Sequence, residues 1–187
     1  MSRIGNLPIQ IPLGVTVEKT DNTLVVNGPK GILKMAMIAD MQIEIAGEKI
    51  IVTRKGDTAK EKSMHGLVRS LINNMVIGVT SGWSRNLELV GVGFKAQGSN
   101  GTLTLSLGFS HPVEVKAPIG IQFEVRDNTK ITVSGIDKYL VGQVAANIKQ
   151  LKPPDVYKGK GVRFEGEYVR RKPGKAGKVG AGATGTK

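Results

Sequence analysis

The sequence predicts an α+β fold of two similar domains, each a small, mostly antiparallel sheet packed with one main helix, plus a flexible basic C-terminal tail. Three observations lead to this prediction. Short segments with strand character fill most of both halves of the 187-residue chain. One amphipathic helix pattern closes each half. The last residues are rich in glycine and lysine, with almost nothing to bury.

The first half reads as strands followed by a helix. The strand segments are separated by the turn residues Asp21-Asn22 and Gly47-Glu48. Asp57 then suits a helix N-cap. Apolar residues recur after it at helical spacing, which indicates one buried face. The predicted strands are 15–18, 23–28, 31–35, 41–46 and 49–54, and the apolar stripe is Met64, Leu67, Val68, Leu71, Ile72 and Met75.

The second half repeats this plan. Asp137 is a second candidate N-cap, and an apolar helix face follows it. The strand–turn–helix pattern that begins at Ile50 returns about 80 residues later, at Ile131. We interpret this as a weak internal repeat, with chance similarity as the alternative. The predicted strands are 87–96, 102–107, 112–117, 121–125 and 130–134, and the helix face is Leu140, Val141, Val144, Ala145 and Ile148.

A boundary near Ser81–Trp83 follows from this repeat. It gives an N-terminal domain of residues 1–81, a C-terminal domain of residues 82–173 and a basic glycine-rich tail of residues 174–187. The tail is too small and polar to offset the backbone ordering entropy of roughly 1–2 kcal/mol per residue, so we expect it to order only on a partner.

Composition narrows the class of function. The formal net charge is +12, which indicates a polyanionic partner, either nucleic acid or an anionic membrane surface. A basic solvated surface without a partner is the alternative. The chain has no cysteine, which excludes disulfides, thiolate metal sites and cysteine nucleophiles. No apolar run is long enough to span a membrane, and the N-terminus lacks the apolar core of a signal peptide, so we expect a cytosolic or matrix-like location.

Positive charge is concentrated near the C-terminus. Residues 152–187 hold 10 Lys and Arg against three Asp and Glu, whereas residues 1–151 hold 17 against 12. Pro153 and Pro154 end the preceding helix, because proline rings cannot continue it. Gly159 and Gly161 lack a Cβ, so the backbone there can approach another chain closely. Cations surround these glycines, which suits contact with a phosphate chain.

This segment resembles the C-terminal signature of the bacterial-type large-subunit ribosomal protein L6 family (uL6). That signature reads roughly Pro-Pro-acidic-x-Tyr-Lys-Gly-Lys-Gly-aliphatic, and residues 153–162 contain every element of it. Further motifs resemble the same family, namely MSRIGNLPIQIP, VTVE, LVVNGPKG and ELVGVGFKA. The resemblance implies two related domains. It also implies contact of the C-terminal region with large-subunit rRNA, near the factor-binding region and the sarcin–ricin loop.

Other motifs indicate structure rather than chemistry. The Gly91–Ala96 pattern G-x-G-x-x-A is followed by hairpin residues instead of a helix, so a bulged or close-packed strand is favoured over nucleotide binding. GPKG and YKGKG do not fit a phosphate-binding loop. His65 and His111 lack carboxylate partners at a suggestive spacing, and we expect structural roles for both. We therefore expect no catalytic residue, no cofactor and no metal site.

The candidate RNA-binding residues lie in the C-terminal cluster. Tyr157 is in a loop and is the best aromatic candidate for contact with a sugar or base. Phe164 and Tyr168 share one face of the predicted strand in GVRFEGEYV, so we expect both to pack on the domain. A solvated face is an equal alternative for Arg170-Arg171-Lys172. The full candidate set is Tyr157, Lys158, Gly159, Lys160, Gly161, Arg163, Arg170, Arg171, Lys172, Lys175 and Lys178.

Together with these observations, the family resemblance implies a structural rRNA-binding protein of the large ribosomal subunit, which we expect to work in the cytoplasm, or in the plastid stroma if it is organelle-encoded. The expected partners are large-subunit rRNA and neighbouring ribosomal proteins, with no membrane and no small-molecule substrate. One alternative is a free-standing nucleic-acid-binding or chaperone module, which would not co-sediment with large subunits. The other is an enzyme with a phosphate-bearing substrate, which would need a pocket with convergent polar groups.

Overall fold

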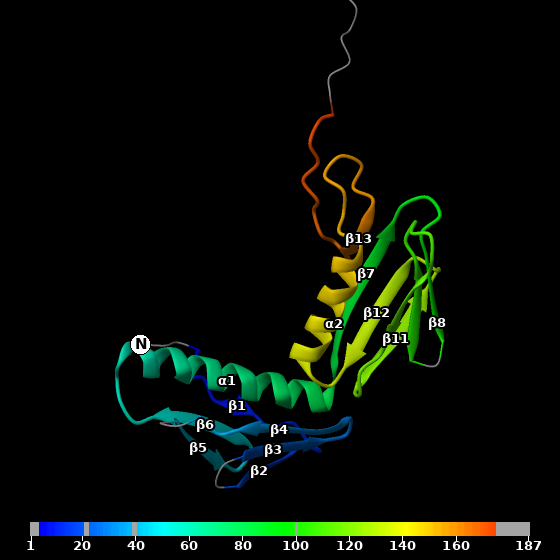
Figure 1. The fold of residues 1–187 in the computed structure, drawn as a ribbon. Helices are drawn as coiled ribbons and strands as arrows, with labels where there is room; N and C mark the ends of the chain where they lie inside the picture. The colour runs from blue at the N-terminus through cyan, green and yellow to red at the C-terminus, as the bar shows by residue number, and fades with distance from the viewer. Residues whose placement is uncertain (1–3, 21–22, 39–40, 100, 175–187) are drawn as a thin grey trace, which may run out of the picture.

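The computed structural model describes residues 4–20, 23–38, 41–99 and 101–174 (Figure 1). These residues form two lobes, each built from antiparallel strands and one helix. The predicted α+β class and its two-domain plan are therefore confirmed. Tail residues 175–187, with Lys175 and Lys178, lie outside the described residues. None of the described helices is long and apolar enough to cross a membrane.

The first lobe places helix α1 over two three-stranded sheets, with strand orders β1-β6-β5 and β2-β3-β4. Apolar side chains from both sheets and from one face of α1 form its core, in which Leu24, Ile50 and Ile72 are fully buried. The elements are β1 (Ile9–Gln10), β2 (Thr16–Thr20), β3 (Thr23–Gly28), β4 (Gly31–Ala36), β5 (Met41–Ala46), β6 (Lys49–Arg54) and α1 (Ala59–Thr80).

The second lobe packs helix α2 on a four-stranded sheet of order β11-β12-β7-β13, and a second sheet, β10-β9-β8, completes its core. Leu87, Leu105, Ile131 and Ile148 are almost completely buried there. The elements are β7 (Trp83–Val90), β8 (Lys95–Ser99), β9 (Thr102–Ser106), β10 (Val113–Lys116), β11 (Ile121–Arg126), β12 (Lys130–Gly135), α2 (Lys138–Leu151) and β13 (Gly161–Phe164).

The strand orders show that the two lobes share one topology. In each lobe the first strand pairs with the last strand of a hairpin, giving β1-β6-β5 and β7-β12-β11. A three-stranded meander lies between them in the chain, and a helix follows the hairpin. The second lobe differs by one addition, because β13 pairs with the free edge of β7.

Local details differ from the prediction at three places. Leu67 and Leu71, which the sequence placed on the buried face of the first helix, are 47% and 37% exposed. The predicted strand 87–96 is two strands, because the backbone turns at Gly91 and Gly93, where φ is 157° and 80°. The predicted hairpin after it is present as β8–β9. Thr58, rather than Asp57, is the N-cap of α1, in a capping box with Glu61. The Asp57 carboxylate instead pairs with Arg54 and with Lys62.

The two histidines lie in different environments. His65 is buried, with Nε2 2.7 Å from the Val52 carbonyl oxygen and Nδ1 3.0 Å from Arg54 Nη1. Because arginine only donates, the ring accepts at Nδ1 and donates through Nε2. His65 thereby ties α1 to β6, which is the structural role that we expected. His111 is exposed in the loop before β10.

The lobes meet where α1 ends. The Trp83 indole N–H donates to the Asn74 carbonyl oxygen at 3.1 Å, and Lys138 Nζ lies 4.3 Å from the centre of the Trp83 ring. Ile136, from the second half, packs against the core of the first lobe. A Cβ at Gly78 would overlap the Ile136 carbonyl oxygen. A fragment of residues 1–81, the predicted N-terminal domain, would therefore lack Ile136 and its contacts with this core.

The close contact at Gly78 can be tested against a second helical glycine. Gly142 in α2 has open space around the position of a Cβ. Gly142→Ala should raise the free energy of unfolding by about 0.5–1 kcal/mol through helix propensity. Gly78→Ala should lower it by about 1–3 kcal/mol, because the added atom overlaps a main-chain oxygen that cannot easily move. Urea unfolding of the full chain measures both changes, and a stabilised Gly78→Ala variant would contradict the junction.

Candidate nucleic-acid interface

The loop between α2 and β13 and the chain after β13 lie together at the end of the second lobe that is farthest from the first (Figure 1). The Lys172 amide, from the chain after β13, donates to the Val156 carbonyl oxygen in the loop at 2.8 Å. Five exposed cations occur on these two segments, and we call them the basic end. They are Lys158, Lys160, Arg170, Arg171 and Lys172.

Asp155 organises the loop. Its carboxylate accepts a hydrogen bond from the Lys158 amide at 3.1 Å, and its carbonyl oxygen accepts one from Gly159 at 2.9 Å. Its own amide donates to the Lys160 carbonyl oxygen at 2.9 Å. The Lys158 amide, followed by those of Tyr157 and Val156, holds the pKa of Asp155 below its usual range. The loop is therefore closed on itself, and its lysines project from a defined backbone.

Gly161 joins this loop to β13 through a close contact within the protein. Its φ is 150°, and a Cβ there would overlap the Pro153 carbonyl oxygen and the Pro154 Cα. Helix α2 ends at Leu151, before these prolines, as predicted. Gly159 has a φ of 70° and lies beside the Arg171 guanidinium. Both glycines are buried. The close approach predicted for them is therefore made to the protein's own chain, and they shape the loop.

Arg163 forms an ion pair within the second lobe. Its Nη2 lies 2.9 Å from Glu88 Oε2 on the neighbouring strand β7, and its Nε lies 3.1 Å from the same oxygen. About a quarter of the side chain, 27%, is exposed. Arg163 therefore helps to fasten β13 to β7 and does not share the exposure of the basic end.

A second ion pair holds the turn after β13. Lys149 Nζ lies 2.6 Å from Glu167 Oε1, and Glu167 Oε2 accepts a hydrogen bond from the Phe164 amide at 3.0 Å. The Phe164 ring contacts the cations of Arg85 and Lys149, which lie 4.6 and 4.7 Å from its centre. Sequence reasoning missed Lys149 and Glu167, and the only available signal was a lysine in the last turn of a helix.

The exposure of the aromatic residues agrees with the prediction for Tyr157 and Phe164 but not for Tyr168. Tyr157 is 58% exposed in the loop, as expected for a residue free to contact a ligand. Phe164 is half-buried on the lobe, also as expected. The prediction for Tyr168 was wrong, because β13 ends at Phe164 and the chain turns at Glu165–Gly166. Tyr168 consequently lies outside the sheet and is 89% exposed.

At this end of the lobe the carboxylates have partners, whereas the exposed cations have no ion-pair partner among the described residues. Within the part of the chain that the structure describes, none of the five cations of the basic end has an ion-pair partner. The nearby carboxylates are engaged: Glu88 by Arg163, Glu167 by Lys149, Asp155 by main-chain amides, and Glu165 by the Asn86 side-chain amide at 2.7 Å. The described residues also contain no cluster of potential metal ligands. The arrangement can bind a polyanion through exposed cations.

The Glu167 pair predicts a dependence of stability on pH. The Lys149 ammonium, and then the Phe164 amide, hold the pKa of Glu167 below its ordinary value of 4.5. A carboxyl group whose pKa is lowered by folding stabilises the protein at pH values above its ordinary pKa. This stabilisation is lost as the pH falls below the ordinary pKa and through the lowered one. Glu167→Gln should therefore be less stable than the parent at pH 7, and the difference should narrow below pH 4.5.

Thermal melts of the full chain across this pH range measure the effect. Glu114→Gln is a matched control, because Glu114 is exposed on β10 and has no partner among the described residues. The control should differ little from the parent throughout. A constant difference between Glu167→Gln and the parent at every pH would contradict the ion pair.

Comparison with known proteins gives a consistent result along most of the chain. The family model described as ribosomal protein L6 matches residues 11–82 and 90–165. The large ribosomal subunit protein uL6 of Clostridium novyi is 55% identical over 179 residues, which cover 95% of this chain and 100% of that protein. The protein of the same name from Halalkalibacterium halodurans is 51% identical over 178 residues, with the same coverage. Both lobes lie within these matches, and the chain belongs to the ribosomal protein L6 family.

Proposed function

We propose that the chain is anchored in the large ribosomal subunit through contact of the basic end with rRNA. Family membership makes it a structural constituent of the ribosome and not an enzyme. The observation that supports the RNA contact is a set of five exposed cations, without acidic partners among the described residues, on two segments fastened together. An anionic backbone would supply the missing partners.

The structure favours recognition of RNA by shape and charge. The lysines of the loop project from a backbone that is fixed by Asp155 and Gly161, so their spacing is set before binding. Each cation that neutralises a phosphate releases condensed counterions, which gives affinity without reading sequence. Tyr157 and Tyr168, both exposed, are the aromatic side chains available to stack on an unpaired base.

We assign a smaller part of the RNA contact to Arg163 than the sequence suggested. Its guanidinium already pairs with Glu88, and an RNA phosphate would have to compete with that carboxylate. Contacts by Lys175 and Lys178 remain part of the proposal on sequence alone. We also propose that the first lobe faces solvent or neighbouring proteins, because it is closer to charge balance: residues 1–81 hold 10 Lys and Arg against seven Asp and Glu, whereas residues 82–187 hold 17 against eight.

The salt dependence of RNA binding tests the basic end. Lys158→Gln, Lys160→Gln and Arg171→Gln should each weaken binding to large-subunit rRNA. Each should also reduce the slope of log K against log salt by about 0.7–0.9 if one phosphate contact is lost. Lys60→Gln is a matched control, because Lys60 is also exposed but lies on α1 of the other lobe. Unchanged slopes in all three variants, or an equal loss in the control, would reject the proposal.

Arg163→Gln should behave differently. Removal of the guanidinium leaves Glu88 without its partner between two strands, so the free energy of unfolding should fall by about 1 kcal/mol. The salt slope of RNA binding should stay close to that of the parent in conditions where the variant is folded. Chemical unfolding and the same titration measure the two effects. A slope reduced as much as in Lys160→Gln, with unchanged stability, would show that Arg163 contacts phosphate instead.

A further inference from the structure

The two lobes share one topology, but a strand position that is occupied in the second lobe is open in the first. In the second lobe β13 covers the outer edge of β7, whereas in the first lobe β1 is an edge strand with β6 as its only partner in the sheet as described. Figure 1 shows β1 lying beneath α1. The site where a counterpart of β13 would lie is therefore unfilled.

The hydrogen-bond register shows which residues of β1 correspond to which residues of β7. The Ile11 amide donates to the Glu48 carbonyl oxygen at 2.8 Å, just as the Leu89 amide donates to that of Thr129 at 2.8 Å. The acceptors directly precede β6 and β12. Ile11 thus corresponds to Leu89, whose partner on β13 is Val162. By the same register Gln10 corresponds to Glu88 and faces the position of Arg163.

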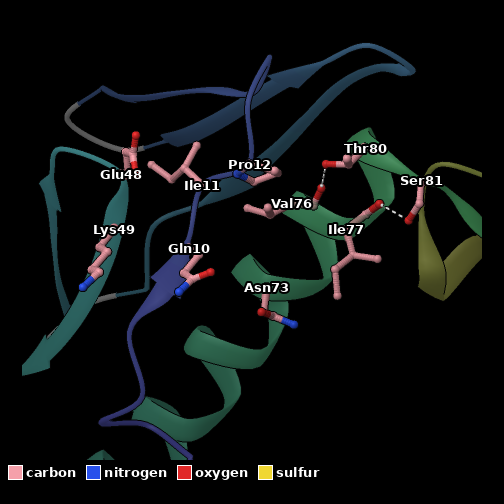
Figure 2. Close-up of a pocket in the computed structure, with 10 residues that line it drawn as sticks. All are labelled: Gln10, Ile11, Pro12, Glu48, Lys49, Asn73, Val76, Ile77, Thr80 and Ser81. Carbon is pink, nitrogen blue, oxygen red and sulfur yellow. Dashed lines mark hydrogen bonds between the residues drawn. The ribbon is translucent and has the colours of Figure 1, made fainter.

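A groove lies at this edge of β1 (Figure 2). It encloses about 430 Å³ and runs between β1 and the C-terminal half of α1. Its walls include Gln10, Ile11 and Pro12 on one side and Asn73, Ile77 and Thr80 on the other. In the second lobe the corresponding space between β7 and the end of α2 holds β13, where the Val162 amide donates to the Lys152 carbonyl oxygen at 2.8 Å.

The groove presents few free polar groups. The hydroxyls of Thr80 and Ser81 donate to carbonyl oxygens of their own helix, at 2.7 and 3.1 Å, as Figure 2 shows. The side-chain amides of Gln10 and Asn73 remain. The two charged residues at the rim, Glu48 and Lys49, have opposite signs. This lining does not attract a phosphate chain, and its apolar walls with a few amides suit a peptide.

We propose that this groove receives a short extended segment of a partner protein, which adds to β1 as β13 adds to β7. The segment carries a small aliphatic side chain opposite Ile11, in the place that Val162 takes opposite Leu89. It carries an uncharged side chain opposite Gln10, because the carboxylate that holds Arg163 in the second lobe is absent there. This inference does not depend on RNA binding by the basic end.

The edge of β1 admits only a short segment. Because Ile11 bonds toward β6, the main chain of Gln10 points outward. Pro8 and Pro12 lie two residues to either side of Gln10, and the Pro12 carbonyl oxygen already accepts a hydrogen bond from the Val15 amide at 3.2 Å. The prolines have no amide hydrogen to donate. Arg69 already donates to the Leu7 carbonyl oxygen at 3.1 Å and to that of Pro8 at 3.5 Å. Gln10 is left to form one pair of hydrogen bonds, and the prolines discourage unselective strand pairing.

A peptide with the sequence of residues 160–166 and the change Arg163→Gln is a suitable probe, because it reproduces β13 without its cation. We expect its addition to the full chain to shift the amide resonances of Gln10, Ile11, Asn73 and Ile77 in a saturable manner. A matched peptide that also carries Val162→Asp should leave them unchanged, since a charge would enter the apolar part of the groove.

Two variants of the protein sharpen the test. Pro12→Val restores an outward amide at the position of Val90 and should tighten peptide binding by roughly fivefold, the value of one net hydrogen bond. Asn73→Trp should fill the groove and abolish binding while the unfolding midpoint stays near that of the parent. The proposal fails if Pro12→Val shows no saturable binding, or if Asn73→Trp binds as well as the parent. Neither result bears on the salt slopes that test RNA binding.

Discussion

The close packing of Gly161 against Pro153 and Pro154 is the contact on which the basic end depends. The prolines stop α2, and Gly161 lets the returning chain pass directly over them into β13. Without that passage, β13 would not reach the edge of β7 in the observed register. The loop that carries Lys158 and Lys160 is simply the chain between these two points. Gly161, whose sequence context suits contact with phosphate, therefore acts by fixing the positions of these lysines.

The internal repeat explains why one lobe carries this interface. Both lobes build the same arrangement of first strand, meander, hairpin and helix, and only the second continues into a further strand and a basic segment. Two ion pairs, Arg163 with Glu88 and Lys149 with Glu167, fasten that continuation to the lobe. Pairing of these cations within the protein separates them from the five that remain exposed. The first lobe keeps an open strand edge in the same place.

Much of the fold could be predicted from the sequence, because hydrophobic periodicity and turn residues are local signals. The N-cap at Asp137 and the helix end before Pro153 are confirmed, and the repeated strand–helix plan is visible in the strand orders. The break at Gly91, the cap at Thr58 and the exposure of Tyr168 depend on neighbours distant in the sequence or on competing local bonds. For the same reason sequence alone could not separate Arg163, whose partner Glu88 lies on another strand, from Lys160.

Photo-crosslinking in intact large subunits tests the central proposal most directly, because it reports contact in the assembled particle. Peptides from residues 156–172 should carry crosslinked rRNA nucleotides, centred on the loop with Tyr157, Lys158 and Lys160. Residues of α1 should yield few or none. Crosslinks to RNA that are confined to the first lobe, with residues 156–172 free of nucleotides, would contradict anchoring through the basic end.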